Sequence, residues 1–467
     1  MQQQDSKGLN ISVRSFIMAI GEIFALMVAA YLLTLFIPGG QYTRTLDASG
    51  NLLIDTSADF IYIQGGLPFW KWLLSPLLVL GAEGSGTLIA VIAFLLVIGG
   101  VFTCLDRCGL MKYMLQKTTN RFGAVRYRLM AVVSLLFMAM GTMIGSFEEC
   151  VPLVPIVVAL SINLGWDALT GIGMSLLAAG CGFAAGACNP FTVGVAQQLA
   201  GLPMFSGAWL RMFSFLLIYL LLYGFLWAYA KKIERPLESV NVSGGFHISS
   251  CMDKGLICFA GILGTGILIV LCSGFIRALQ DYTMIIVAVM FLVAGICSVW
   301  LCRMKGKQLG KSYLNGVGSI LPAVVMILMA SSIRFTLEEA KVLDTILHEA
   351  VNQAQNLPGW TVILFIYGIV LAMNFFIPSG SAKAFMLIPL IVPMAQVFGL
   401  SAQLCVVAFA FGDGFSNVFY PTNPALLIAL GLADTSYGDW FRWSGRFQLT
   451  NLVLTSLILM LGLATGY

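Results

Sequence analysis

The sequence predicts an all-α polytopic membrane protein made of two inverted-topology repeats, each with a re-entrant helical hairpin and a discontinuous transmembrane helix. Three observations predict this fold: an apolar composition, recurring apolar stretches of span length, and an ordered internal similarity. Of the 467 residues, 59% are hydrophobic and only 10% are charged. Such a chain has too little polar surface to fold as a soluble globule, so the bilayer is its expected solvent.

Apolar stretches long enough to cross the ~30 Å hydrocarbon core recur along the chain, since a helix of about 20 residues suffices at ~1.5 Å per residue. The clearest predicted spans are residues 15–36, 87–105, 205–230, 255–275, 283–301 and 447–464. Residues 68–81 are compatible with an interfacial helix and with a short span. Lys7 and Arg14 precede the first span without a small-residue cleavage site, so we expect that span to be retained.

Basic residues gather in short loops and set the expected orientation, because cytoplasmic loops are enriched in Lys and Arg. Three basic clusters fall within residues 107–128, 231–235 and 303–311. The acid-rich segments 42–60 and 336–356 are then expected to face outward. These assignments predict a multi-pass protein of the cytoplasmic (inner) membrane whose N-terminus is cytoplasmic.

The composition argues against several other classes of protein. Eleven cysteines lie scattered without CxxC pairs and the histidines are His247 and His348, so neither a zinc site nor a disulfide framework is predicted. The net charge of +4 is modest, and no nucleic acid partner is expected. The motifs GxxxxGK[ST], HExxH and GxSxG are absent. We therefore expect neither an enzyme nor a cofactor, with a membrane enzyme or a channel as remote alternatives.

Two stretches of the chain match each other at a constant offset of 234 positions without gaps. The equivalent pairs are Pro155 with Pro389, Gly165 with Gly399, Gly180 with Gly414, and Asn189-Pro190 with Asn423-Pro424. Single matches of Gly or Pro are common by chance, but an ordered series indicates an internal repeat.

The basic clusters place the two repeats in opposite orientations. The predicted N-terminal half, residues 1–230, holds the first span or spans, an inner hairpin at about 128–163 and a broken helix at about 168–203, and residues 231–252 form a cytoplasmic linker. The predicted C-terminal half, residues 253–467, holds spans at about 253–336, an outer hairpin at about 359–398, a broken helix at about 402–433 and a last span at about 446–465. The hairpin tips and both Asn-Pro breaks should lie near the membrane midplane.

Small polar residues are concentrated at these predicted breaks. Non-helical backbone persists in hydrocarbon only around a polar cavity or a buried site, because each unpaired backbone group costs several kcal/mol. The predicted solute-binding residues are Ser146, Glu148, Glu149, Asn189, Thr192, Ser379, Gly380, Ser381, Lys383, Asn417, Thr422 and Asn423. The predicted ion-coupling residues are Asp413, Glu149, Asn189 and Asn423, with Na⁺ or H⁺ as the coupling ion. Purely structural Pro kinks would explain one Asn-Pro pair well and four coordinated breaks poorly.

Four charged residues are predicted near the midplane, where ionisable groups are costly and usually face a cavity or a partner: Glu148, Glu149, Lys383 and Asp413. Glu149 and Lys383 occupy equivalent places in the two repeats, so one tip is acidic and the other is basic. A mutual ion pair between these two residues is the simplest structural alternative. Favourable capping of a half-helix is a second alternative for the glutamates.

The motifs "GSFEECVPLVPI", "GFAAGACNPFTVGVAQQLAGLP" and "IPSGSAKAFMLIPLIVPMAQVFGL" resemble those of YfcC-type members of the DcuC (C4-dicarboxylate anaerobic carrier) family, within the ion transporter superfamily. The resemblance runs over nearly the whole chain. It implies a scaffold part that dimerises, a transport part that carries both hairpins, and elevator-like alternating access. The Ser-Asn-Thr tip signature of the dicarboxylate/sodium branch is absent from both tips, so sodium sites do not carry over by residue.

The predicted site charges favour a solute with one carboxylate and a cationic end, because Glu148, Glu149 and Asp413 against Lys383 leave two net negative charges. This favours basic amino acids such as arginine and ornithine, transported by exchange or with a coupling ion. The resemblance implies the same substrates, since YfcC-like proteins are provisionally described as basic amino acid antiporters. A mono- or dicarboxylate transporter coupled to Na⁺ or H⁺ remains the alternative.

Overall fold

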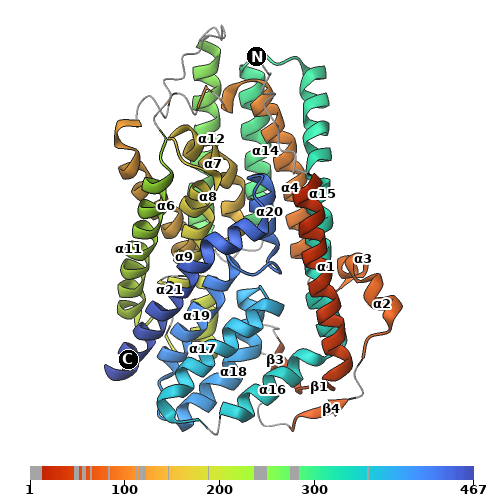
Figure 1. Ribbon diagram of the computed structural model, residues 1–467, viewed down its shortest axis with the longest axis vertical. Coiled ribbons are helices and arrows are strands. Elements are labelled where there is room, and N and C mark those ends of the chain that lie inside the picture. The colour runs from red at the N-terminus through yellow and green to blue at the C-terminus, as the bar shows by residue number, and fades with distance from the viewer. Residues whose placement is uncertain are drawn as a thin grey trace.

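The computed structural model (Figure 1) is a bundle of long helices with a small group of strands at one end. It describes residues 13–46, 52–54, 59–63, 66–82, 85–111, 113–114, 117, 123–145, 147–187, 189–203, 205–235, 250–273, 283–354 and 357–467. The following statements concern these residues.

The first half of the chain contains the elements α1 (Val13–Phe36), β1 (Gly39–Gln41), β2 (Arg44–Leu46), β3 (Leu52–Ile54), β4 (Ile61–Ile63), α2 (Phe69–Leu73), α3 (Ser75–Leu78), η1 (Val79–Gly81), α4 (Ser85–Arg107), η2 (Gly123–Val125), α6 (Arg126–Ile144), η3 (Glu148–Leu153), α7 (Val154–Asn163), α8 (Ala168–Ile172), η4 (Gly173–Leu177), α9 (Ala178–Ala185), η5 (Pro190–Gly194), α10 (Val195–Leu199) and α11 (Ala208–Ile233). The second half contains α12 (Ser250–Ser273), α14 (Thr283–Leu301), α15 (Gly306–Glu339), α16 (Val342–Ala354), α17 (Gly359–Phe376), α18 (Gly380–Val397), α19 (Ala402–Asn417), α20 (Pro424–Leu432) and α21 (Tyr437–Ala464).

Within the described residues, seven helices are long and apolar enough to cross a membrane. They are Leu88–Arg107, Gly123–Met143, Ala168–Ala185, Ala208–Ile233, Gly306–Glu339, Gly380–Val397 and Tyr437–Ala464. Their length matches the hydrocarbon core, and the chain is a multi-pass membrane protein. Residues 68–81, for which the sequence left two alternatives open, contain the short segments α2, α3 and η1 instead of one helix of span length.

The four short strands were not predicted from sequence. β1 pairs with β4 and β2 pairs with β3, both antiparallel. The β1–β4 pair lies against α16, where the backbone N–H of Gly40 donates to the carbonyl of Lys341 (2.9 Å). Outside a helix, these backbone groups need partners, and strand pairing supplies them.

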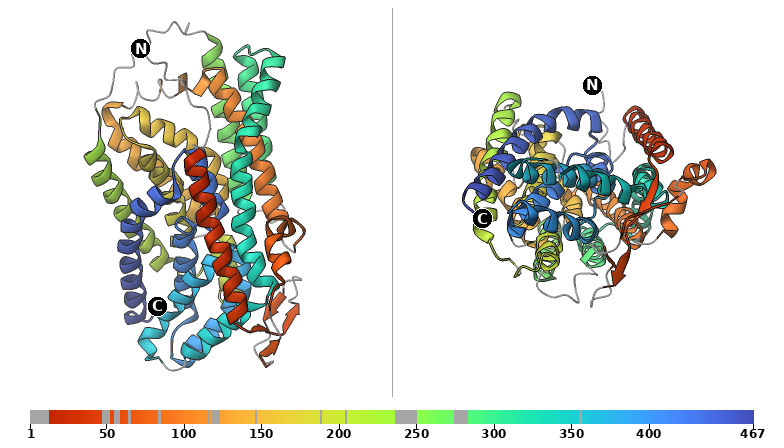
Figure 2. Two further views of the ribbon diagram at one scale, coloured as in Figure 1. Left: turned by 45° about the vertical axis from the view of Figure 1, so that its right-hand side comes forward. Right: turned by 90° about the horizontal axis from the view of Figure 1, so that it is seen from below.

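One group of helices consists of α1, α4, α12, α14 and α15, which pack against one another. Figures 1 and 2 show α15 running along most of the length of the molecule beside α4. Gly316 allows this contact, because a Cβ at that position would lie 2.2 Å from the carbonyl oxygen of Gly99 on α4. Small residues at helix crossings are typical of membrane bundles.

A second group is centred on α9 and α19, which pack directly on each other. Every residue of α9 is buried, as is every residue of α19 except Gln403. In each predicted repeat the first helix of the hairpin packs on the first part of the broken helix: α6 packs on α9, and α17 packs on α19. The second part of each broken helix packs on the other half's hairpin, α10 on α18 and α20 on α7.

The crossing of α9 and α19 depends on two glycines. A Cβ at Gly180 would lie 2.3 Å from Val418, and a Cβ at Gly414 would lie 2.3 Å from the backbone of Ala184. Residues 180 and 414, and residues 184 and 418, are both separated by the same offset of 234. Each contact is therefore the counterpart of the other.

Candidate functional site

The break in the N-terminal half begins where α9 ends at Gly186, which adopts a left-handed conformation (φ 50°). Asn189 follows, and its side-chain Oδ1 accepts the backbone N–H of Thr192 (3.2 Å). Asn189 also lies directly against the end of α6, because a Cβ at Gly145 would be 2.0 Å from the same Oδ1. Gly145 is itself left-handed (φ 68°), so only glycine fits there without strain. The broken helix and the first predicted hairpin tip thus meet at Asn189.

The break in the C-terminal half separates α19 from α20. Asn423 caps α20: its Oδ1 accepts the N–H of Ala425 (2.9 Å), and its Nδ2 donates to Oδ1 of Asn417 (3.0 Å). Pro424 stands at the first helical position, where its missing N–H costs nothing. The two asparagines hold the ends of the interrupted helix together across the break.

A buried polar network joins this break to the second predicted hairpin. Lys383 on α18 donates from Nζ to Oδ1 of Asp413 on α19 (2.6 Å), and neither side chain is exposed to any degree. Lys383 also donates to the side-chain oxygen of Asn374 on α17. The amide nitrogen of Asn374 donates to Ser416 Oγ (2.6 Å) and to Asn417 Oδ1 (3.0 Å). One ion pair and one amide therefore tie together α17, α18 and α19.

The two halves of the molecule meet at Gly380, the first residue of α18. A Cβ at this position would lie 2.4 Å from Thr192 Cγ2 and 2.5 Å from Asp413 Oδ2. Glycine at the start of α18 thus lets a residue of the N-terminal break approach a carboxylate of the C-terminal half.

Three oxygens at these breaks are buried without a hydrogen-bond partner among the described residues: Asp413 Oδ2, Thr192 Oγ1 and Thr422 Oγ1. An uncompensated buried polar group costs on the order of 1–3 kcal/mol, and more when it is charged. In a membrane protein such groups are candidate sites for a proton, a cation or a solute.

The structure buries the predicted C-terminal residues Lys383, Asn417, Thr422 and Asn423. Hydrogen bonds through Asn374 link Lys383, Asn417 and Asn423 in the network around Asp413. Ser379 and Ser381 flank Gly380 and are half-buried. On the N-terminal side Asn189 and Thr192 are fully buried. Ser146 and the side chains of Glu148 and Glu149 lie outside the described residues, although the backbone of both glutamates forms the start of η3.

The sequence analysis predicted that Lys383 binds the solute and that Asp413 binds the coupling ion. In the structure these two residues form one ion pair. Asn374 and Ser416 were not predicted from the sequence. A signal for Asn374 was present, since it is the sole amide side chain in the apolar helix α17, and polar residues within spans usually have a partner. Ser416 carried no comparable signal.

The described residues contain no group of three or more His, Cys, Asp or Glu side chains placed to hold a metal ion. A Na⁺ site would thus depend on the neutral oxygens of Thr and Asn beside Asp413, which are hard ligands of the kind that such a cation accepts.

A bundle of spanning helices, in which two interrupted helices surround buried charged and polar groups, defines a membrane transporter. The chain belongs to the DcuC family, C4-dicarboxylate anaerobic carriers, whose family model matches residues 16–464. It is therefore a carrier and not an enzyme.

Relatives of the chain fit this class. It is 28% identical over 406 residues to the Escherichia coli K12 protein named "Putative basic amino acid antiporter YfcC", covering 82% of this chain and 79% of that protein. It is 23% identical over 176 residues to a citrate transporter of Bacillus subtilis, covering 38% of this chain and 41% of that protein. Among solved structures, the YdaH transporter of Alcanivorax borkumensis matches with a TM-score of 0.43 and 16% identity, covering 97% and 99% of the two chains.

Proposed function

We propose that this carrier is a secondary active transporter of small carboxylate-bearing solutes that also carry positive charge, with basic amino acids such as arginine and ornithine as the favoured substrates. The observation that carries the proposal is the buried Lys383–Asp413 pair at the place where the two helix breaks meet. Since this pair is internally neutral, the remaining charge at the tips is that of Glu148 and Glu149. Two carboxylates at one tip would favour a cationic group on the solute.

The carboxylate of the solute would bind at the start of α18. Ser379 precedes that helix without a side-chain cap, so its first backbone N–H groups remain available to an anion. The name of the Escherichia coli relative supports a basic amino acid and exchange transport.

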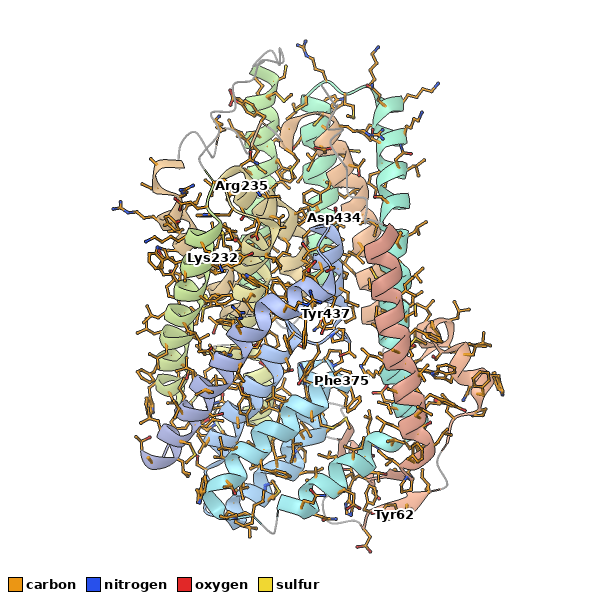
Figure 3. All side chains as sticks on the ribbon, in the orientation of Figure 1. Tyr62, Lys232, Arg235, Phe375, Asp434 and Tyr437 are labelled. Atoms are coloured by element: carbon orange, nitrogen blue, oxygen red, sulfur yellow. The ribbon has the colours of Figure 1, made fainter. Side chains whose placement is uncertain are left out.

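We propose that the two halves are inverted repeats. The reciprocal contacts of Gly180 with Val418 and of Gly414 with Ala184 support this. When two repeats are related by a two-fold axis, each contact between them recurs with the equivalent residues exchanged between the repeats. The predicted hairpins at about 128–163 and 359–398 correspond to helix–break–helix segments, α6–η3–α7 and α17–α18. Figure 3 supports a mid-membrane break, since Phe375, beside the second tip, lies between Tyr62 at one end of the molecule and Arg235 toward the other.

Alternating access of the elevator type follows as a proposal. The elements around the breaks pack on one another, while α1, α4, α12, α14 and α15 form a separate group that could remain fixed and dimerise. With the basic loops inside, the protein would lie in the inner membrane with a cytoplasmic N-terminus.

A dicarboxylate or citrate transporter coupled to Na⁺ or H⁺ is the second candidate, favoured by the family's description and by the Bacillus subtilis relative. In that case the solute would draw Lys383 away from Asp413 and a cation would neutralise the freed carboxylate.

Counterflow in proteoliposomes separates the two candidates. Uptake of labelled arginine should rise when the vesicles contain arginine or ornithine, and should not rise when they contain succinate or citrate. Uptake of labelled succinate or citrate that depends on a Na⁺ or pH gradient, together with no uptake of labelled arginine, would establish the second candidate and refute the first.

Two substitutions test the site itself. Lys383→Met and Glu149→Gln should each reduce exchange toward the level of empty vesicles. Lys307→Met, at an exposed position of α15, is the matched control and should keep it. Undiminished exchange in both site variants would remove the proposed site.

A further inference from the structure

A cavity of about 260 Å³ lies between α17, α19 and α21. Aromatic side chains form much of its wall, among them Tyr367, Phe415, Phe419 and Tyr420. No Lys, Arg, Asp or Glu is among its lining residues. It is slightly smaller than the ~300–1,000 Å³ of sites for drug-sized ligands, which suits a fragment-sized molecule.

Asn451 of α21 gives this cavity a polar feature. The residue is 1% exposed, and neither its Oδ1 nor its Nδ2 has a hydrogen-bond partner among the described residues. It lies in the buried stripe of α21, one turn after Phe447 and one turn before Thr455. A side-chain amide has one acceptor and two donors, and leaving both ends unpaired in an apolar site is costly.

Three other polar side chains around the cavity already have partners. Tyr367 shares a hydrogen bond with Thr455 (2.9 Å), and Gln448 donates to the carbonyl of Phe415 (3.2 Å). Ser416 donates to the carbonyl of Gly412 (2.6 Å). Asn451 is therefore the fully buried side chain of the described wall that has both polar ends left for a ligand.

We propose that this cavity binds a small uncharged molecule with an aromatic body and one amide-like group, the amide pairing with both ends of Asn451. A charged ligand would find no counter-charge in the wall, whereas an aromatic ring would pack edge-to-face against the side chains that line it. The ligand enters from the bilayer, because the cavity is bordered by Leu449 and Leu452, which are 66% and 38% exposed on a membrane-spanning helix.

Occupancy of this site would act on the transport network through Ser416. That residue lines the cavity and accepts a hydrogen bond from Asn374, which in turn accepts one from Lys383. A ligand beside Ser416 is thus two hydrogen bonds away from the Lys383–Asp413 pair. The site is independent of which solute the carrier transports.

The experiment is ¹⁹F NMR of 4-fluoroacetanilide with the full-length protein in detergent micelles, using unlabelled acetanilide as competitor. Wild-type protein should broaden the fluorine signal saturably, and acetanilide should reverse the broadening. The hydrocarbon 4-fluoroethylbenzene, which lacks the amide, should bind at least about tenfold more weakly, as expected from the loss of a buried hydrogen-bonding group.

Two variants locate the binding. Asn451→Leu should bind 4-fluoroacetanilide only as weakly as wild-type protein binds 4-fluoroethylbenzene. Gly445→Leu should abolish binding by filling the cavity, since the nearest atom to a Cβ there is Phe419 at 4.0 Å. Gly438→Leu is the matched control on the same helix, outside the cavity and with open space around it, and should bind like wild type.

Three results would overturn the proposal: no saturable binding to wild type, equal binding to Asn451→Leu, or equal binding to Gly445→Leu. The first would mean that water satisfies Asn451. If Asn451→Leu fails to fold, the comparison of Gly445→Leu with Gly438→Leu still decides whether the probe binds in the cavity.

Discussion

Two ion pairs fix distant parts of this carrier, and their surroundings differ. The Lys383–Asp413 pair lies between α18 and α19 with neither side chain exposed, whereas in the Arg44–Asp344 pair the arginine is 32% exposed and the aspartate 7%. The first pair lies beside oxygens at the helix breaks that have no partner among the described residues, and the second belongs to a cluster of side chains joined by several hydrogen bonds. The difference agrees with our proposal that the first pair belongs to the transport site, whereas the contacts of the second pair attach the strands to α16.

The outer cluster, formed by Tyr42, Arg44, Phe60, Asp344 and His348, holds β1, β2 and β4 to α16 through several redundant contacts. Arg44 donates to both carboxylate oxygens of Asp344 (2.7 and 2.8 Å), which also accepts the backbone N–H of Tyr42 (3.2 Å). Burial and the neighbouring Asp344 raise the pKa of Tyr42 to about 12. Its hydroxyl is therefore protonated at physiological pH and shares a hydrogen bond with Nδ1 of His348 (3.0 Å), on which Phe60 stacks.

The largest effect is expected for Lys383→Met. Removing one partner of a fully buried pair leaves Asp413 uncompensated, which should lower the free energy of unfolding by about 3–5 kcal/mol. The double variant Lys383→Met/Asp413→Leu should regain most of this loss, because no buried charge remains. Unfolding in mixed micelles, followed by circular dichroism, measures both. A double variant as unstable as the single one would contradict this account.

A smaller effect is expected at the crossing of α9 and α19. Gly414→Ala places a Cβ 2.3 Å from the backbone of Ala184, so the helices must separate. Overpacking of this kind costs about 1–3 kcal/mol. Gly368→Ala, on α17 with open space around it, is the matched control and should change the free energy of unfolding by less than about 1 kcal/mol. Equal effects of the two substitutions would show that the crossing is not tight.

The sequence predicted those features of the fold that depend on local chemistry. Span-length apolar stretches became α1, α4, α11, α12, α14 and α21, and both Asn-Pro pairs interrupt helices. Hydropathy and proline act within a few residues, so one sequence suffices to locate them. The family resemblance is likewise confirmed by the match over residues 16–464.

The partners of the charged residues could not be predicted in this way. Lys383 and Asp413 are 30 positions apart on different helices, and their meeting depends on how α18 packs on α19. The strands were missed because each spans three residues, too few to give a period of two. The roles assigned to Glu148, Glu149 and Ser146 remain predictions.

The smallest effect is expected for Arg44→Leu, and salt makes the comparison sharper. In this variant Asp344 still accepts the hydrogen bond from the backbone N–H of Tyr42. A partly exposed ion pair contributes about 0–1 kcal/mol, so the free energy of unfolding should fall by no more than that. Raising NaCl from ~0.05 to ~1 M should remove most of this difference between wild type and variant, because the Debye length falls to about 3 Å. The loss caused by Lys383→Met should persist unchanged, since salt does not enter a buried pair. Unfolding of Arg44→Leu, Lys383→Met and the control Arg44→Lys at both salt concentrations measures this contrast. If both losses fall equally with salt, the two pairs are equally solvated, and the functional distinction between them fails.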